Sequence, residues 1–277
     1  MKSVTIVGCG WFGLPMAVDL LNHDYSVKGS YRKSEKLPLL KNLGVKPFQL
    51  DLSERVKLQS FNDNELAIIR EHLQSDYLII NIPPKLKHKN QNYLEKLNAL
   101  KSLTNIDNYK RVIFISSTGV YPSLGMDMQE ESACEHSESS TTLLQAEKLF
   151  LNYSNVCVVR FAGLIGPSRA PGRFLAGRKA VAGGNNPVNL VHLSDCIRAI
   201  LAIISAEKVS PIYNLCTPHH PTKSDFYSKA SMALSLPSPE FVSDNLPAKT
   251  VNGLRLCNEL NFSYKYQNLY DAIKDTN

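Results

Sequence analysis

Three glycines stand close together near the start of the chain, at a spacing that suits phosphate binding. The segment VTIVGCGWFG, residues 4–13, places Gly8, Gly10 and Gly13 directly after a run of strand-forming residues. After such a strand, the first glycine permits a tight turn, the second lets the backbone approach a pyrophosphate, and the third lets a helix pack against the sheet. Backbone amides at the start of that helix then face the phosphates. The segment predicts a dinucleotide site formed by Gly8, Gly10, Trp11, Phe12 and Gly13.

The end of the second expected strand bears on the choice of dinucleotide. About 20 residues beyond such glycines, an Asp or Glu typically binds the adenosine ribose of NAD. Here the stretch GSYRKS contains no carboxylate and offers two hydroxyls and two cations, from Ser30, Arg32, Lys33 and Ser34. These groups suit a ribose 2′-phosphate, so the sequence favours NADP over NAD. The alternative is that Arg32 and Lys33 are solvated loop charges.

The segments that position these residues alternate along most of the chain. Unbroken apolar runs predict strands, and amphipathic segments between them predict helices. This pattern is typical of an α/β fold, a Rossmann-type doubly wound parallel sheet with helices on both faces. Asp51 and Leu52, which close the third strand, are expected to flank the adenine. The expected strands are 4–8, 25–30, 45–50, 76–81, 111–116, 155–160 and 211–215, and the expected helices are 11–22, 34–43, 64–73, 91–104, 140–152 and 194–206.

The length of 277 residues fits one extended domain, 1–277. The Rossmann core is expected to comprise residues 1–163 with 189–216. A Gly/Pro/Arg-rich stretch at 164–188 and the weaker pattern of 217–277, with two or three short helices, predict a small C-terminal substrate lobe. Such a lobe belongs at the carboxyl edge of the sheet, where ligands bind in these folds.

Composition argues against several other classes of protein. Apolar residues make up 43% of the chain, without low-complexity runs, which excludes a disordered segment or a solenoid. The start MKSVTIVG enters a strand at once and leaves no room for a secretory leader, so a cytoplasmic location is expected. No apolar run approaches the roughly 20 residues that a membrane span needs, so no membrane role is expected.

Charge, cysteine and histidine patterns are equally unspecific. The net charge of +6 is spread out and is not interleaved with aromatics, so nucleic acid is not an expected partner. The densest basic cluster, KLKHK at 85–89, is interpreted as a solvated helix start, with a substrate-phosphate site as the alternative. Six cysteines form no C-x-x-C pair and seven histidines show no ligand spacing, so no disulfide and no metal is expected.

The segment RVIFISSTGVYPS, residues 111–123, resembles the extended branch of the short-chain dehydrogenase/reductase family, the NAD-dependent epimerase/dehydratase type. The likeness continues through RFAGLIGPSR at 160–169, NLVHLSDCIRAI at 189–200 and IYNLCTPHHPT at 212–222. Within that family the chain is most similar to the atypical YeeZ-like members, which share the GCGWFG-style turn, NIPP at 81–84 and the TTLLQAEKLF helix. Together these segments cover most of the chain.

The resemblance implies roles for further residues. Ile82 and Pro83 are expected to lie along the cofactor, Thr118 to be the polar group nearest the substrate, and Arg169 to face a substrate phosphate or carboxylate. His192 and Asp195 are expected to be structural. The residues implied near the nicotinamide are Ser116, Ser117, Phe161, Ala162 and Gly163.

The family's catalytic pair is missing from this sequence. Family chemistry uses Tyr-x-x-x-Lys, in which the lysine lowers the tyrosine pKa so that the phenol can exchange a proton with the substrate. If EKLF at 147–150 aligns with the end of the family's helix, the two positions are Ser139 and Leu143. No Lys or Arg occurs anywhere from 112 to 147, so a shifted alignment cannot restore the pair.

Two hypotheses follow. The first is an NAD(P)-binding oxidoreductase or epimerase-like enzyme, a monomer or homodimer, that acts on a polar, nucleotide-linked substrate with a non-standard proton donor. The second is a catalytically inactive protein that holds NADP as a sensed or structural ligand. The replacement donors considered are Tyr121, Cys134, Glu131 and His136. Thr118 and Tyr121 are favoured, with Ser117 beside them, because they follow the strand directly.

Overall fold

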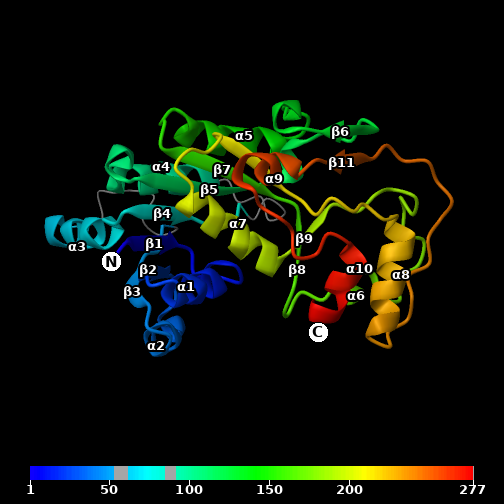
Figure 1. The fold of residues 1–277 in the computed structure, drawn as a ribbon, viewed down its shortest axis with the longest axis horizontal. Coiled ribbons are helices and arrows are strands. Elements are labelled where there is room, and N and C mark those ends of the chain that lie inside the picture. Colours follow the sequence, from blue (N-terminus) through cyan, green and yellow to red (C-terminus); the bar gives the residue numbers. More distant parts are fainter. Residues whose placement is uncertain (53–61, 85–91, 277) are drawn as a thin grey trace. The chain divides into compact units, whose positions relative to one another are not determined.

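The computed structural model describes residues 1–52, 62–84 and 92–276. Seven strands form one sheet in the order β10-β7-β5-β4-β1-β2-β3 (Figure 1). The pairings of β1 with β2 and β4, of β2 with β3, and of β4 with β5 are all parallel. This confirms the predicted Rossmann-type fold. The strands are β1 (Ser3–Val7), β2 (Ser26–Tyr31), β3 (Lys46–Gln49), β4 (Tyr77–Ile80), β5 (Arg111–Ser117), β7 (Val156–Phe161) and β10 (Ile212–Leu215).

Helices cover both faces of the sheet, which explains the unbroken apolar strands. In Figure 1, α1 (Gly13–Asn22) and α2 (Leu37–Asn42) lie on one face, and α4 (Tyr93–Leu103) and α5 (Glu138–Leu151) lie on the other. The helix α3 (Asp63–Leu73) packs beside α4. Because both faces are covered, every residue of β4 is buried. Short 3-10 helices span Ser34–Lys36 (η1), Ile106–Asn108 (η4), Thr118–Val120 (η5), Glu130–Ser132 (η6) and Ile273–Thr276 (η7).

The chain forms two compact units. The first unit comprises Met1–Ser116 and Thr141–Val159, and the second comprises Ser117–Ser140 and Arg160–Asn277. This grouping places α7 (Leu193–Ser205) and β10 in the second unit. The sequence-based division, with 189–216 in the core and 164–188 plus 217–277 as the lobe, stays a prediction.

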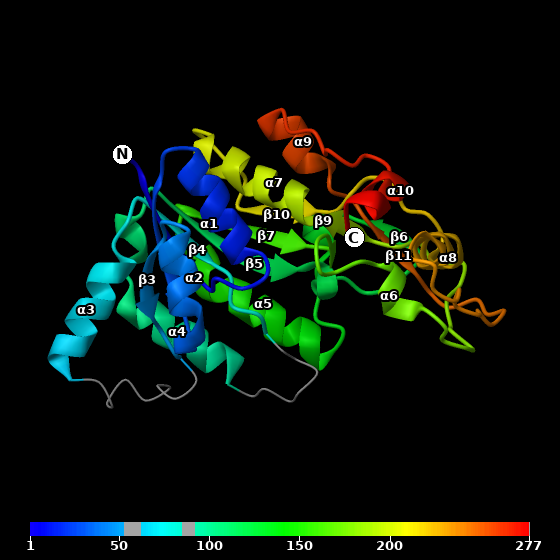
Figure 2. The ribbon, with the colours of Figure 1, turned by 90° about the horizontal axis from the view of Figure 1, so that it is seen from below.

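The second unit contains short elements that the sequence did not predict. Two parallel pairs of three-residue strands occur, β6 (Met126–Met128) with β11 (Lys249–Val251), and β8 (Gly163–Ile165) with β9 (Leu190–His192). Three helices lie side by side in both ribbon views, α6 (Gly172–Leu175), α8 (Lys223–Ala233) and α10 (Leu269–Ala272) (Figures 1 and 2). The helix α9 (Leu254–Leu260) contacts β10 and α7.

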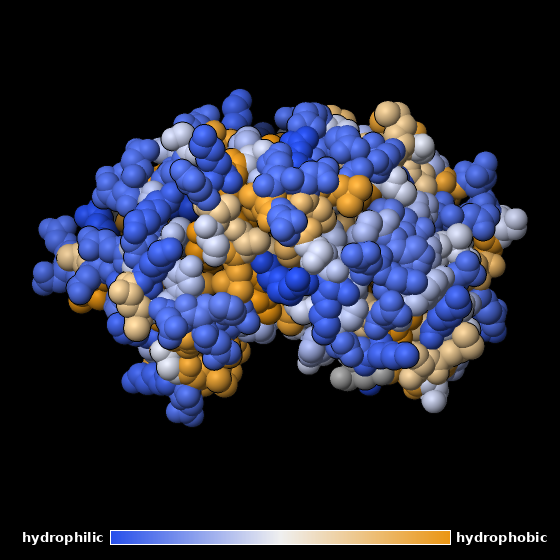
Figure 3. Space-filling model, viewed as in Figure 1, coloured by the Kyte–Doolittle hydropathy of each residue, from blue (hydrophilic) through white to orange (hydrophobic). Residues whose placement is uncertain are grey.

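Apolar side chains are concentrated inside each unit. On the face shown in Figure 3, hydrophilic side chains predominate and apolar ones lie in smaller patches between them. Among the described residues, no helix has both the length and the apolar character needed to cross a membrane.

Candidate functional site

The turn after β1 depends on two of its three glycines for packing. Gly8 has φ +108°, and a Cβ there would lie 2.2 Å from the backbone oxygen of Asn81. A Cβ on Gly13 would lie 2.2 Å from the backbone oxygen of Gly8. The Asn81 amide Nδ2 donates to that same Gly8 oxygen at 2.9 Å. Any side chain at either position would therefore displace backbone, which explains Gly8 and Gly13 without a ligand.

Gly10 differs from its two neighbours. A Cβ on Gly10 would meet nothing within 4 Å, and its φ is not in the left-handed region. The helix α1 begins just beyond it with no side-chain cap and no acidic residue in its first turn, so its positive end carries no carboxylate of its own. Trp11 and Phe12 lie between Gly10 and Gly13, the first residue of α1, and Phe12 is buried. Open space beside Gly10 and an uncapped helix start fit a bound pyrophosphate.

The residues expected at the adenosine ribose have different surroundings. Ser30 is buried, and its Oγ accepts a hydrogen bond from the Gly8 amide at 2.9 Å. Ser30 therefore shapes the glycine turn, and the expectation that its hydroxyl serves a ribose phosphate stays a prediction. Arg32 and Lys33 follow β2 and are exposed. Asp51 is half-buried and Leu52 is buried.

A third cation near this turn was missed in the sequence. The Lys36 Nζ donates to the backbone oxygen of Cys9 at 3.2 Å, which brings an ammonium group against the glycine turn. Burial raises the pKa of the Cys9 thiol to about 12, against the opposing effect of Lys36. The sequence indicated Arg32 and Lys33 as cations near the cofactor, but not Lys36. The one sequence feature that could have indicated Lys36 is its place in the same basic segment.

Ser116 at the end of β5 is engaged by α5. Its Oγ donates to Glu147 Oε1 at 2.5 Å, and only 1% of Glu147 is exposed. Burial and the Glu147 charge raise the pKa of the nearby Tyr93 phenol. Ile82 is half-buried and Pro83 exposed beyond β4. The sequence placed Ser116 at the end of the strand but did not identify Glu147 as its partner.

Tyr121 in the second unit is a packing residue. It is 0% exposed, its hydroxyl donates to Asn214 Oδ1 at 2.6 Å, and it accepts from Arg160 Nη1 at 2.7 Å. The same Arg160 nitrogen donates to the backbone oxygen of Glu130 at 2.7 Å. Burial raises the pKa of the Tyr121 phenol. These contacts correct the expectation that Tyr121 replaces the lost proton donor.

Ser117 ends β5 and caps the short helix η5, which begins at Thr118. The Ser117 Oγ accepts from the Gly119 amide at 3.1 Å and so caps that turn. Thr118 is buried at the first position of η5. The structure thus places Ser117 at the end of β5 and Thr118 directly after it.

The helix α5 carries no phenol or ammonium at the two family positions. Ser139 is exposed, and Leu143 is buried with 4% of its surface exposed. The other donors considered are exposed: Cys134, His136 and Glu131. Glu131 is engaged by Arg255 Nη2 at 2.6 Å, and His136 Nδ1 lies 3.0 Å from the Cys134 backbone oxygen. Their exposure gives none of them an environment typical of a catalytic acid.

The remaining implied residues lie in the second unit. Phe161 and Ala162 are buried, and Gly163 begins β8 in contact with Leu190, whose Cδ2 would lie 2.6 Å from a Cβ on that glycine. Arg169 is exposed and ends a tight turn closed by its amide on the Gly166 oxygen, at 2.8 Å.

His192 and Asp195 hold the start of α7. The His192 ring accepts from the Ser194 amide at 3.2 Å. Asp195 is fully buried and accepts from the backbone amides of Lys265 and Tyr266, at 2.6 and 3.3 Å. Both contacts agree with the structural role that was expected.

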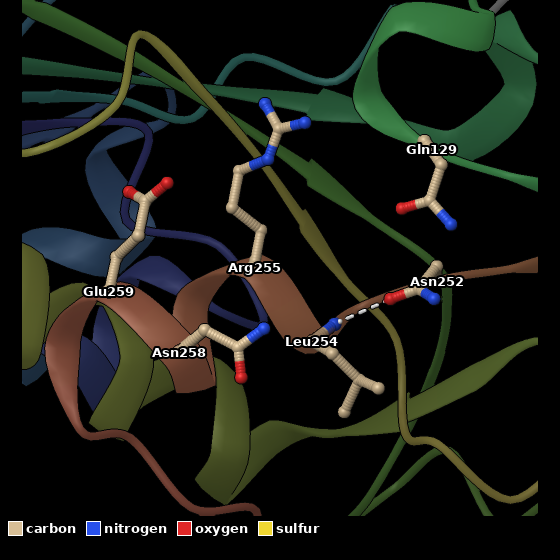
Figure 4. A pocket seen from close by; sticks show the side chains of 6 residues that line it. All are labelled: Gln129, Asn252, Leu254, Arg255, Asn258 and Glu259. Carbon is tan, nitrogen blue, oxygen red and sulfur yellow. Dashed lines mark hydrogen bonds between the residues drawn. The ribbon is translucent and has the colours of Figure 1, made fainter.

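A polar hollow of the second unit lies over α9 (Figure 4). Its charged groups engage residues of the same unit: Arg255 pairs with Glu130 at 3.1 Å, and Glu259 accepts from the Tyr213 hydroxyl at 2.6 Å. The Asn252 side chain accepts from the Leu254 amide, the dashed contact in Figure 4. These bonds anchor α9. The hollow is lined by Gln129, Asn252, Leu254, Arg255, Asn258 and Glu259.

Comparison with known proteins decides the family. The model of the NAD dependent epimerase/dehydratase family matches residues 4–216. This range includes the glycine turn, the turn after β5 and the strand β10. The chain belongs to the NAD dependent epimerase/dehydratase family. It is therefore an NAD(P)-binding, epimerase-like protein of a family of enzymes, with a nicotinamide dinucleotide as cofactor.

A relative and two solved structures are similar over nearly the whole chain. Protein YeeZ of Escherichia coli K12 is 33% identical over 272 residues, 96% of this chain and 97% of YeeZ. The structure titled MoeE5 in complex with UDP-glucose and NAD has a TM-score of 0.78 at 18% identity, covering 99% and 97% of the two chains. UDP-glucuronic acid 4-epimerase from Bacillus cereus, in complex with NAD, has a TM-score of 0.77 at 17% identity, covering 99% and 96%. At these identities, the structural likeness supports the fold.

Proposed function

We propose that this protein is an NADP-dependent oxidoreductase or epimerase-like enzyme that acts on a hydroxyl or carbonyl group of a polar, nucleotide-linked substrate. The observation that carries the proposal is Gly10. A Cβ there would meet no protein atom within 4 Å, whereas Gly8 and Gly13 are required by backbone contacts. A glycine that the fold itself does not need is explained by a ligand that approaches its backbone.

The preference for NADP rests on the segment after β2. Arg32 and Lys33 are both exposed there, and Glu35, the nearest carboxylate along the chain, comes only in η1. A guanidinium group suits a dianionic ribose 2′-phosphate better than it suits neutral ribose hydroxyls. The Lys36 ammonium, which donates to the Cys9 backbone oxygen, adds positive charge to the glycine turn after β1.

The remaining cofactor contacts are part of the same proposal. The glycine turn holds the diphosphate through its backbone, with Trp11 and Phe12 beside it, and Arg32 and Lys33 hold the ribose phosphate. Arg169 binds an anionic group of the substrate. The residues proposed along the adenine and the nicotinamide are Asp51, Leu52, Ile82, Pro83, Ser116, Phe161, Ala162 and Gly163.

A nicotinamide dinucleotide held there would supply or accept the hydride that interconverts a substrate alcohol and carbonyl. The protein must then move a proton at the substrate oxygen. Ser117 and Thr118 are proposed to orient that oxygen by hydrogen bonds, since Ser117 ends β5 and Thr118 follows it directly. The proton donor is not the family's tyrosine, because Ser139 and Leu143 occupy the two expected positions.

A nucleotide-linked substrate is proposed by analogy with similar structures. The MoeE5 structure contains UDP-glucose with NAD, and the Bacillus cereus protein is a UDP-glucuronic acid 4-epimerase. The cytoplasmic location and the monomeric or homodimeric state remain predictions beside this proposal.

Thermal shift and calorimetry with NADPH and NADH test the cofactor assignment. A ligand that binds only the folded state stabilises it by about 2.7 kcal/mol at 100 times its Kd. We expect NADPH to stabilise the protein more than NADH at equal concentration, and Gly10→Ala to reduce both shifts strongly. A larger shift with NADH would show that Arg32 and Lys33 are solvated charges.

One observation favours the second candidate, a dinucleotide-binding protein without turnover. Leu143 fills the expected lysine position with a buried apolar side chain. This candidate predicts tight dinucleotide binding together with no oxidation or reduction of any hydroxyl or carbonyl compound tested. Loss of turnover in Thr118→Val, with dinucleotide binding intact, would exclude it.

A further inference from the structure

The turn after β5 has an ammonium group that comes from a distant part of the chain. We propose that Lys249 on β11 replaces the missing lysine and phenol, and gives its proton to the substrate oxygen beside Thr118. This inference rests on the proposed function, since it names the proton donor of the same site.

Lys249 reaches the backbone of the turn directly. Its Nζ donates to the Thr118 backbone oxygen at 3.2 Å and also to the backbone oxygen of Tyr121. An ammonium group has three donor hydrogens, so these two bonds leave a third. The two carbonyls fix the position of Nζ beside Thr118, the residue expected nearest the substrate.

The backbone of Lys249 is also held in place. In the β6–β11 pair, Lys249 lies opposite Met126. The Asn189 side chain brackets the residue, because its Nδ2 donates to the Lys249 oxygen at 2.9 Å and its Oδ1 accepts from the Val251 amide at 2.8 Å. A long flexible side chain that is fixed at both ends loses little further entropy when a substrate binds.

The charge environment favours release of a proton. Burial lowers the pKa of the Lys249 ammonium. Within the described part of the chain, no carboxylate lies within ion-pair distance of its Nζ. The titratable groups on the packed elements are engaged elsewhere: Asp127 on β6 accepts from Thr250 and Asn252, and the Tyr121 phenol bonds Asn214 and Arg160.

The proposed step balances in the reductive direction. The substrate C=O π bond breaks, its carbon gains a hydride from the reduced nicotinamide, and its oxygen gains a proton from Lys249 Nζ. Lys249 becomes a neutral amine and recovers its proton from water. In the oxidative direction the neutral amine accepts the proton from the substrate hydroxyl.

The first test asks whether Lys249 reaches a bound carbonyl group. The probe is pyridoxal 5′-phosphate, which forms a Schiff base with an accessible neutral amine and is trapped by borohydride. Lys223 is the matched control in the same unit, because its Nζ also donates to a backbone oxygen, that of Ala182, at 2.8 Å. We expect at least about tenfold more trapping at Lys249 than at Lys223, measured by peptide mass spectrometry near neutral pH. Equal or weaker trapping at Lys249 would overturn the proposal.

The second test uses Lys249→Met, Lys249→Arg and the control Lys223→Met. For any carbonyl substrate that the wild type reduces, Lys249→Met should lower kcat by about 100-fold, the typical contribution of a general acid. The fall of wild-type kcat at high pH should move to higher pH in Lys249→Arg. A residue that only caps the turn would instead leave this pH profile unchanged in Lys249→Arg, which would overturn the proposal.

NADPH binding, followed by thermal shift on the same variants, separates the two hypotheses. Wild type and Lys249→Met should bind the dinucleotide equally. If neither protein binds it, the proposed function fails. If both bind it and kcat is unaltered in Lys249→Met, only the role of Lys249 as proton donor is rejected.

Discussion

The turn after β1 and the turn after β5 each follow a buried parallel strand, but different features determine their function: the backbone in the first and side chains in the second. In the first, the determinants are backbone spacing and the absence of side chains at Gly8, Gly10 and Gly13. In the second, the determinants are side chains, and those of Tyr121 and Lys249 are both bound to partners of the second unit.

This difference explains which of the family's features this chain has retained. Few sequences can form a dinucleotide-binding turn, because few residue types permit close approach of the backbone to a phosphate. A proton donor needs only a suitable pKa and position, and several elements can supply it. The chain has therefore kept the glycine turn while its α5 helix has lost the catalytic pair.

The largest expected effect distinguishes the structural glycines. Gly13→Ala would place a Cβ 2.2 Å from the Gly8 backbone oxygen. Because backbone must move, we expect a loss of about 4 kcal/mol or more in the free energy of unfolding. Urea denaturation of the purified variant measures this loss. A change of less than about 1 kcal/mol would show that the turn tolerates side chains.

Gly10→Ala is the matched comparison and should separate binding from stability. Its Cβ meets open space, so the free energy of unfolding should stay within about 0.5 kcal/mol of wild type. NADPH affinity should fall by about 100-fold, or about 2.7 kcal/mol, measured by calorimetry. Unchanged affinity would remove the observation on which the proposed function depends.

Tyr121→Phe tests whether the second turn uses its phenol for packing or for chemistry. The variant removes the buried hydroxyl that donates to Asn214 Oδ1 and accepts from Arg160 Nη1. We expect a loss of about 1–3 kcal/mol in stability. NADPH binding at 25 °C should be unchanged. Wild-type stability with abolished turnover would restore Tyr121 as a catalytic candidate.

Arg32→Ala sharpens the cofactor assignment. Loss of the guanidinium should weaken NADPH binding by about tenfold, or about 1.4 kcal/mol, and leave NADH binding unchanged. Arg173→Ala, at an exposed arginine on α6, is the control. Equal effects of Arg32→Ala on both dinucleotides would contradict a phosphate-specific contact.

The smallest expected effect lies at Asp76, directly before β4. Asp76 accepts from the Ser3 amide at 2.8 Å and pairs with Lys110 at 2.9 Å. These contacts lower the Asp76 pKa from 3.8 to about 2, with Lys110 contributing most. The depressed pKa stabilises the fold above about pH 4, and the effect is lost as the pH falls toward 2. Because the carboxyl is partly exposed, we expect about 1 kcal/mol. Asp76→Asn should flatten the acid limb of the stability profile.

Most of the fold could be predicted from the sequence, because strands such as β4 and β5 are continuous apolar runs with helical patterns between them. The strands β6, β8, β9 and β11 could not, since three residues carry too little periodicity and their pairing is set by tertiary contacts. The cluster KLKHK at 85–89 lies outside the described residues.

The glycine turn was predictable because its meaning is local. The partners of the functional side chains were not, since they come from distant segments. The bond that Ser30 Oγ accepts from the Gly8 amide could not be predicted from the position of Ser30 at the end of β2. Glu147 and Lys249 were missed because the residues they contact, Ser116 and Thr118, are 31 and 131 positions away in the chain.

The pairing of β6 with β11 has a consequence for how the protein is made. A ribosome completes the whole glycine turn within the first 13 residues, but Thr118 waits for the synthesis of another 131 residues before Lys249 exists. A nascent or prematurely terminated chain that ends before β11 thus contains the phosphate-binding sequence without the ammonium of the second turn. Such fragments would lack the proposed acid, so no proton transfer from Lys249 is expected before the chain has been synthesised through β11.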